Sequence, residues 1–299
     1  MSERNLRNIK YMMRFLPDSL YIQAYYFARF KKFCNLKNPR TFNEKLNWLK
    51  LHDHNPLYPT MVDKCEAKKY VANIIGEQHI IPTLGVWNTF DEVDFDALPN
   101  QFVLKCTHDC DALAIVRDKS KMNKAAVKKR LEAALKQNFY YVAREWQYKN
   151  LKSRIIAEAY MDDSDNTDSL NKGRCLMNYK LFCFNGNPLF LYVANLNDVR
   201  ISFLNLDWSF AGFQRSDYKM FDELPPKPSC LDEMIEIARK LSKGLPFVRV
   251  DLYEINHTVY FSELTLTPSG GFIPFEPKEW DEKLGGLLDL GSVKGYAQN

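Results

Sequence analysis

Two acidic side chains and an arginine lie inside apolar, strand-like segments, and this pattern constrains the fold more than any other. Residues 247–254 read Phe-Val-Arg-Val-Asp-Leu-Tyr-Glu and residues 258–266 read Thr-Val-Tyr-Phe-Ser-Glu-Leu-Thr-Leu, which indicates a β-hairpin. Charged groups are costly to bury without partners. We therefore expect Asp251 and Glu263 to hold Mg²⁺, with Arg249 beside the same phosphates. The alternative is a surface hairpin with ordinary ion pairs.

The length of the hairpin loop decides whether these three side chains share one face of the sheet. A two-residue turn, 256–257, would place Asp251 opposite Ser262 and point Glu263 to the other face. A three-residue loop, 255–257, would bring all three side chains to one face. We predict the three-residue loop, with a residue in the left-handed conformation inside it.

Two lysines lie in other apolar strand-like segments. Lys105 follows Phe-Val-Leu and precedes a polar turn, so its ammonium group could reach a nucleotide phosphate. Lys180 lies within residues 177–184, on the same face as Phe182 and opposite Leu181. A lysine in so apolar a strand is expected to have a buried phosphate or carboxylate partner.

Residues 155–161, Ile-Ile-Ala-Glu-Ala-Tyr-Met, predict a strand that enters an acidic loop. Backbone groups in this segment could bond the edge of an adenine. The carboxylate of Glu158 could accept the adenine amino group.

Composition excludes a disordered, collagen-like or low-complexity chain. Of 299 residues, 46% are apolar and 26% charged, which indicates an ordered globular chain. We expect no signal peptide and no membrane span. The seven cysteines form no CxxC pairs, so reduced thiols and a cytoplasmic location are expected.

Charge is uneven along the chain. Residues 1–40 hold nine basic and two acidic residues, although the net charge of the whole chain is only +4. This basic region, which also carries apolar residues, could touch the inner membrane face or an anionic glycan. A helix packed on its own domain is the alternative. No nucleic-acid-binding motif is present, so nucleic acid is not an expected partner.

The order of elements predicts an α+β protein with antiparallel sheets. Residues 5–76 read as helical, with a capping box at Thr41–Glu44 and a helix over 62–75 that ends at Gly76. Short β-rich segments and isolated helices follow, including a hairpin turned by Asn185-Gly186.

These residues together resemble the ATP-grasp fold. The Arg-x-Asp strand, the Glu-x-Thr segment and Thr267-Pro-Ser-Gly270 look like the metal-binding end of D-alanine–D-alanine ligases. Over nearly the whole chain the sequence is more similar to the TupA-like ATP-grasp family, which is associated with teichuronopeptide and capsular polysaccharide gene sets. This resemblance is carried by residues 41–50, 62–64, 81–85, 102–108, 179–186 and 247–252.

The resemblance implies three regions. A helical N-terminal region (1–80) would precede a smaller lobe (81–160) and a larger lobe with the metal site (161–299). ATP would lie between the lobes, and the residues expected to contact it are Lys105, His108, Glu158, Ala159, Tyr160, Met161 and Lys180. Asp251, Glu263 and Thr265 would hold Mg²⁺, and Arg249 and Lys180 would be catalytic.

The implied reaction joins a carboxylate to an amine. The carboxylate attacks the γ-phosphate of ATP and becomes an acyl phosphate, and the amine then displaces phosphate to leave an amide. The resemblance suggests an amino acid and an acidic sugar or peptide as substrates, in surface polysaccharide biosynthesis.

Two departures from the family pattern keep other functions open. The turn 108–112 contains no glycine, and Thr265 stands where ATP-grasp enzymes often have asparagine. Two short Asp-x-Asp sequences, 109–111 and 163–165, also fit a glycosyltransferase that uses a nucleotide sugar. A degenerate, non-catalytic nucleotide-binding protein is the third interpretation.

Overall fold

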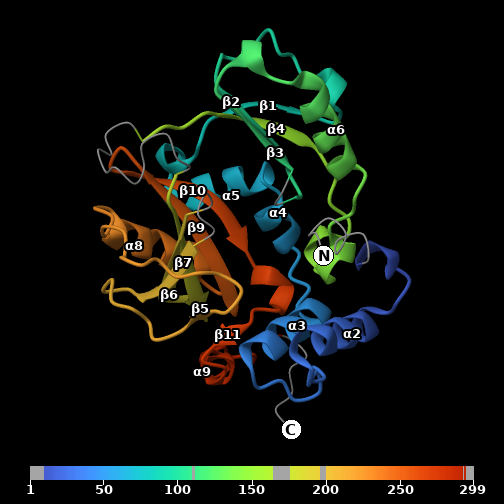
Figure 1. Ribbon diagram of the computed structural model, residues 1–299, viewed down its shortest axis with the longest axis vertical. Helices are drawn as coiled ribbons and strands as arrows, with labels where there is room; N and C mark the ends of the chain where they lie inside the picture. The colour runs from blue at the N-terminus through green and yellow to red at the C-terminus, as the bar shows by residue number, and fades with distance from the viewer. Residues whose placement is uncertain (1–9, 110–111, 164–175, 196–199, 292, 294–299) are drawn as a thin grey trace.

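The computed structural model describes residues 10–109, 112–163, 176–195, 200–291 and 293, and within these the strands form sheets of four, five and two strands. Figure 1 shows the four-stranded sheet at one end of the molecule and the five-stranded sheet beside the helices of the other end. No helix in the described part of the chain is long and apolar enough to cross a bilayer.

The four-stranded sheet is antiparallel and is covered on one face by a helix. Its strand order is β1 (Thr83–Trp87), β4 (Ile155–Ala159), β2 (Phe102–Cys106) and β3 (Leu113–Val116). Alternate residues of β2, namely Phe102, Leu104 and Cys106, are buried in a core with α6 (Lys124–Leu135). The other face therefore carries Lys105 and Glu158.

The five-stranded sheet is also antiparallel and separates two apolar cores. Its strand order is β10 (Thr258–Thr265), β9 (Phe247–Ile255), β5 (Asn178–Phe184), β6 (Asn187–Asn195) and β7 (Arg200–Asn205). On one face, Leu181 and Cys183 pack with α5 (Glu66–Ile75) and α8 (Leu231–Ser242). On the other, Phe182 and Phe184 pack with α3 (Phe42–His52) and α9 (Glu279–Leu287). The face assignment for Lys180 is confirmed by this alternation.

The remaining elements lie outside these two sheets. They are α2 (Asp18–Phe30), α4 (Tyr58–Val62), α7 (Tyr140–Ala143), and the two-stranded sheet of β8 (Gln214–Arg215) and β11 (Phe275–Glu276). The capping box of Thr41 and Glu44 is confirmed at the start of α3. The hairpin turned by Asn185-Gly186 is confirmed as well, with Phe184 opposite Asn187.

The predicted helix over 62–75 is wrong at its first turn. The chain forms α4 and then α5, with residues 63–65 between them in a different path. Asp63 leaves the helix and its Oδ1 accepts bonds from the backbone N–H groups of Cys65 and Glu66. The carboxylate of Asp63 accepts hydrogen bonds from backbone N–H groups that would otherwise continue the first helix, and a new helix begins after it.

The predicted three-residue loop between β9 and β10 is wrong. Ile255 pairs with Thr258 across a two-residue turn in which Asn256 and His257 both have positive φ, 49° and 58°. The shared face survives because a β-bulge between Phe261 and Glu263 shifts the register by one residue. Glu263 therefore lies opposite Asp251.

One face of α3 binds the backbone of the segment that follows β10. The amide of Asn43 bonds both the C=O and the N–H of Ile273, and the amide of Asn47 donates to the carbonyl of Gly271. Lys50 donates to the carbonyl of Gly270 at 2.7 Å. Because these three helix residues are spaced i, i+4 and i+7, they line one stripe of α3.

The segment held by α3 has an unusual backbone. Ser269, Gly270 and Gly271 have φ values of 52°, 64° and 79°. A Cβ on Gly270 would lie 2.7 Å from that of Ala143, and one on Gly271 would lie 2.9 Å from the Asn47 amide nitrogen. Glycine is required here both for the left-handed conformation and for the close approach.

The Asn47 side chain supplies the first test of this arrangement. Asn47→Ala removes a fully buried amide and leaves the Gly271 carbonyl without that donor, so we expect the free energy of unfolding to fall by about 2–3 kcal/mol. Denaturant unfolding measures it. The matched control is Asn73→Ala on the exposed face of α5, expected within about 0.5 kcal/mol of the unmodified protein. Equal effects of the two changes would contradict the arrangement.

The β9–β10 turn supplies a second test. Because a non-glycine residue with positive φ is strained, we expect His257→Gly to raise the free energy of unfolding by about 1 kcal/mol. His257→Ala keeps the Cβ and removes only the imidazole, so it should bring no such gain. If alanine and glycine stabilise equally, the strain lies elsewhere.

Candidate active site

Four side chains form a row across the five-stranded sheet. Lys180 of β5 pairs in register with Tyr192 of β6 and with Asp251 of β9, and Asp251 pairs in register with Glu263 of β10. The ammonium of Lys180 forms a short ion pair with Asp251, whose side chain is fully buried. The buried carboxylate partner expected for Lys180 is therefore present.

Arg249 lies at the centre of this group. Its Nη2 atom donates to Oδ2 of Asp251 at 2.7 Å, to Oε1 of Glu263 at 3.0 Å and to Oγ1 of Thr265 at 3.0 Å. Its Nε donates to the other oxygen of Asp251 at 2.6 Å. The oxygens of the three predicted metal ligands thus converge on one positively charged nitrogen.

Opposite charges offset part of the cost of burial in this group, although burial still raises the pKa of Asp251 above its ordinary value despite Arg249 and Lys180. Burial alone would lower the pKa of Lys180, but the Asp251 carboxylate raises it above its ordinary value. Burial would raise the pKa of Glu263, and the positive charges of Lys180, Lys64 and Arg249 hold that pKa well below its ordinary range. Glu263 therefore remains an anion and a hard oxygen donor at neutral pH.

Carboxylate and hydroxyl oxygens of this kind suit Mg²⁺. The ion prefers one or two carboxylates with further oxygen ligands, and Asp251, Glu263 and Thr265 offer such a set around one point. The guanidinium of Arg249 also supplies positive charge at that point. The chemistry of the donors fits the ion.

A second charged cluster lies on the four-stranded sheet. Glu158 is buried, and its two carboxylate oxygens pair with Lys105 and Lys68, each at 2.6 Å. Lys68 comes from α5 and also donates to the carbonyl of Ile81. Burial would raise the pKa of Glu158, but Lys105 and Lys68 hold it below its ordinary value. The structure thus brings Lys105 and Glu158 together.

Two of the three residues that follow Glu158 form hydrogen bonds with other parts of the chain. The N–H of Ala159 donates to the carbonyl of Pro82, and the hydroxyl of Tyr160 accepts a bond from Arg117. Met161 is half-buried beside them. The contacts of Ala159, Tyr160 and Met161 with adenine stay a prediction.

His108 is held against a helix end. Its Nε2 lies 3.2 Å from the carbonyl oxygens of Ala134 and Gln137, at the C-terminus of α6, and the side chain is buried. Burial lowers the pKa of His108. These contacts favour a supporting role for the imidazole, and its contact with nucleotide stays a prediction.

Sequence reasoning missed Lys64 and Lys68 as site residues. Lys64 donates to the backbone carbonyl of Asp109, its own N–H bonds the carbonyl of Thr107, and its charge acts on Glu263. The turn between α4 and α5 therefore contacts the loop after β2 and also lies near Glu263. Lys68 could have been found, because it occupies the apolar face of its helix one turn before Val71.

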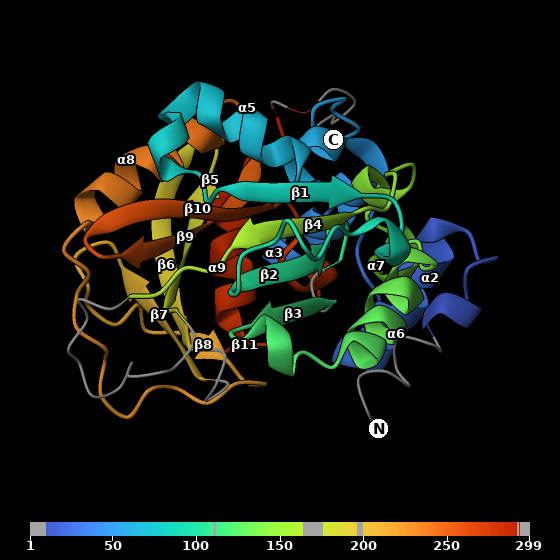
Figure 2. The ribbon, with the colours of Figure 1, turned by 90° about the horizontal axis from the view of Figure 1, so that it is seen from above.

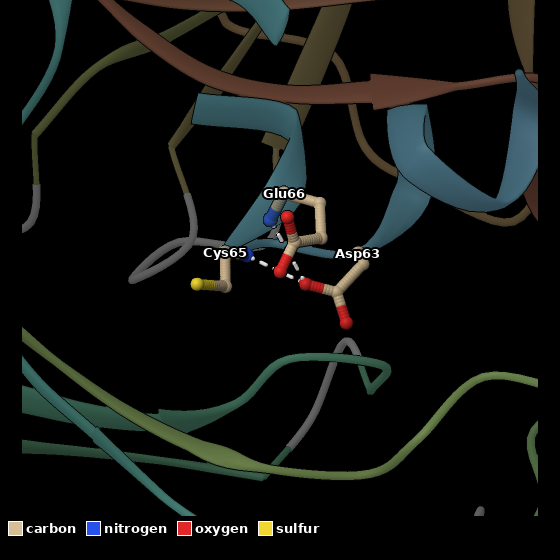
Figure 3. A group of neighbouring side chains, drawn as sticks. All are labelled: Asp63, Cys65 and Glu66. Carbon is tan, nitrogen blue, oxygen red and sulfur yellow. Dashed lines mark hydrogen bonds between the residues drawn. The ribbon is translucent and has the colours of Figure 1, made fainter. Parts of the chain in front are cut away.

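Figure 3 shows Asp63, Cys65 and Glu66 at the start of α5. The arrangement has a structural explanation: Arg154 Nη2 pairs with Asp63 at 3.1 Å and with Glu66 at 2.9 Å, and Asp63 bonds the first N–H groups of the helix. Acidic groups at a helix N-terminus are stabilised by the helix dipole. We therefore assign this cluster to helix capping.

The two Asp-x-Asp sequences and the glycine-free turn lie only partly within the described residues. Residues 110–111 and 164–165, which complete the two Asp-x-Asp sequences, lie outside the described residues, as does the middle of the glycine-free turn 108–112. Asp163 accepts a bond from the N–H of Asn256. The three-region division at 80/81 and 160/161 also stays a prediction.

Solved structures with a similar chain path were compared with this protein. A D-alanine–D-alanine ligase from Helicobacter pylori has a TM-score of 0.41 and 14% identity over 71% of this chain and 53% of its own. The ATP-grasp ligase PsnB, in complex with precursor peptide PsnA2 and AMPPNP, has a TM-score of 0.42 and 11% identity over 82% and 64%.

This chain thus spans about half to two thirds of the length of those two proteins. No curated protein sequence matches it significantly. The sequence signature described as TupA-like ATPgrasp matches residues 44–289, which include both charged clusters and the segment held by α3. The chain therefore belongs to the TupA-like ATP-grasp family, and the α+β ATP-grasp fold expected from its sequence is confirmed.

Proposed function

We propose that this protein is an ATP-dependent ligase that joins a carboxylate to an amine and forms an amide. The observation that carries the proposal is the convergence of Asp251, Glu263 and Thr265 on the Nη2 atom of Arg249. Three oxygen donors around one cation on the face of a sheet suit a metal–phosphate group. Family membership supports ATP as the phosphate donor.

The proposed roles follow from the charges. Asp251, Glu263 and Thr265 would hold Mg²⁺, which neutralises phosphate charge when bound. Lys180 balances the charge of Asp251, and Arg249 donates hydrogen bonds to the phosphoryl oxygens during transfer. The substrate carboxylate attacks the γ-phosphorus and ADP leaves. The amine then attacks the acyl phosphate, phosphate leaves with the former bonding electrons, and the amine loses a proton.

The second cluster would bind the remainder of the nucleotide. Lys105 would exchange its bond with Glu158 for a nucleotide phosphate, while Lys68 continues to neutralise Glu158. Glu158 would accept the adenine amino group beside Ala159, Tyr160 and Met161. Lys68 is therefore proposed as the residue that lets Lys105 leave its carboxylate partner.

The family also supports a finer proposal for the substrates. They would be an amino acid and an acidic sugar or peptide, joined in the cytoplasm during surface polysaccharide biosynthesis. Among the described cysteines all five are free thiols, which fits a reducing compartment.

Calorimetric titration of ATP with Mg²⁺ tests the site directly. Glu263→Gln removes the charge of the partly accessible carboxylate, so we expect affinity to fall at least about tenfold. Asp251→Asn should act in the same direction, with circular dichroism to verify folding because this residue neutralises two buried cations. The control is Glu282→Gln, an exposed carboxylate of α9.

The products then separate the competing functions. The ligase predicts ADP and phosphate in equal amounts over many turnovers, and this sustained release requires carboxylate and amine together. Release of a nucleoside diphosphate from a sugar nucleotide would contradict it in favour of a glycosyltransferase. Tight ATP binding without turnover across a panel of uronic acids and amino acids would favour a non-catalytic nucleotide-binding protein.

Lys68 supplies a separate prediction. Lys68→Met leaves the buried Glu158 with one cationic partner, so we expect the free energy of unfolding to fall by about 3 kcal/mol at neutral pH. Because the pKa of Glu158 is below its unfolded value of 4.5, this loss should be complete above pH 4.5 and shrink as the pH falls through the folded-state pKa. Denaturant unfolding at several pH values measures it.

The neighbouring exposed Lys69→Met is the matched control and should change stability by less than about 0.5 kcal/mol. ATP affinity should also fall in Lys68→Met, because Lys105 stays bound to Glu158. A loss of stability that is constant with pH would contradict the assigned pairing.

A further inference from the structure

We infer that the surface around α2 docks on an anionic lipid bilayer. This surface, called the α2 patch below, consists of Leu20, Phe27, Lys31, Lys32 and Phe33. In Figures 1 and 2 α2 lies at the edge of the molecule, away from the five-stranded sheet. The inference is independent of the proposed reaction.

The apolar side chains of the patch are strongly exposed. Leu20 is 56% exposed, Phe27 is 46% and Phe33 is 69%, and the rings of the two phenylalanines stack with centroids 5.1 Å apart. Leu20 and Phe27 are seven residues apart, so they lie on the same face of the helix. Leu20 therefore lies on the helix face that also carries the stacked Phe27 and Phe33 rings.

This exposure is unusual because α2 already has a buried face. Tyr21, Ile22 and Tyr26 are fully buried in a core that includes Phe272. A helix that packs on its own domain normally presents polar residues to water on the opposite side. Here the outward face is apolar as well. The segment just before the helix adds two further exposed apolar residues, Met12 at 67% and Phe15 at 76%.

The chain segment that carries the patch is nearly all positive in charge. Residues 10–40 hold seven basic residues, Lys10, Arg14, Arg29, Lys31, Lys32, Lys37 and Arg40, and one acidic residue, Asp18. Asp18 accepts bonds from the hydroxyl of Tyr140 and lies 3.7 Å from Arg144, so it is already paired. Asp217, from a distant part of the chain, neutralises Arg29 at 2.7 Å. Lys31 and Lys32 directly join the helix to Phe33.

Exposed apolar groups within a cationic surface match an anionic bilayer. Acyl chains accept the phenylalanine and leucine side chains, and the phosphate headgroups attract the lysines, so the two contributions act together. A soluble polyanion would satisfy the charges and leave the rings in water. A symmetric dimer through the patch would bring two cationic surfaces together.

Vesicle co-sedimentation with the full chain tests this inference. We expect binding to vesicles of equal parts phosphatidylglycerol and phosphatidylcholine, weaker binding at high salt, and little binding to pure phosphatidylcholine. Lys31→Glu with Lys32→Glu should weaken binding by about tenfold or more. Phe27→Ser with Phe33→Ser should do the same through loss of the apolar contact.

The matched control is Phe210→Ser, which removes an aromatic ring of 45% exposure elsewhere on the surface and should leave vesicle binding unchanged. Circular dichroism and ATP titration verify that each variant is folded. Absence of binding by the unmodified protein would overturn the inference. Vesicle binding that the phenylalanine changes do not affect would also overturn it, because such binding indicates a site for a polyanion. A dimer in sedimentation velocity that only the phenylalanine changes dissociate would overturn it in favour of self-association.

Discussion

The buried pairing of Arg249 with Asp251 is the interaction on which the rest of this structure depends. Both charges lie in an interior strand of the sheet, where an unpaired charge would be very costly. Lys180 on the adjacent strand completes the compensation, and Glu263 and Thr265 join through Arg249. The same arrangement gathers hard oxygen donors around one cationic point. The residues that compensate one another's buried charge are therefore the same residues that we propose for metal–phosphate chemistry.

The polar residues along one face of α3 bind the backbone of a distant segment. Asn43, Asn47 and Lys50 hold the backbone of the segment after β10, in which three successive residues have positive φ. Burial lowers the pKa of Lys50 to about 7, and its amine bonds two backbone carbonyls in this confined environment. The segment follows Thr265 closely in the chain. A helix far away in sequence thus fixes the backbone that follows Thr265.

The turn between α4 and α5 connects the two charged clusters. Lys64 contacts the loop after β2 and acts electrostatically on Glu263, and Lys68 pairs with Glu158 on β4. Both lysines come from one short stretch of chain. Glu158 and Asp251 each have two cationic partners, so one partner can move without leaving the carboxylate unpaired.

The sequence by itself determined most of the local elements and the placement of charged residues within apolar strands. Alternation in β5 placed Lys180 on the correct face, the capping box began α3, and apolar strands with embedded charges indicated a compensated group. Tertiary structure alone decided the register that brings Glu263 opposite Asp251, because the bulge before Glu263 reverses the effect of a two-residue turn. It also decided that Lys68 joins Lys105 on Glu158, since that contact joins a helix to a strand distant in the chain. Local sequence patterns specify which face of a strand or helix a side chain occupies. Tertiary packing, and the energetic cost of an unpaired buried charge, determine which residues far apart in sequence form ion pairs.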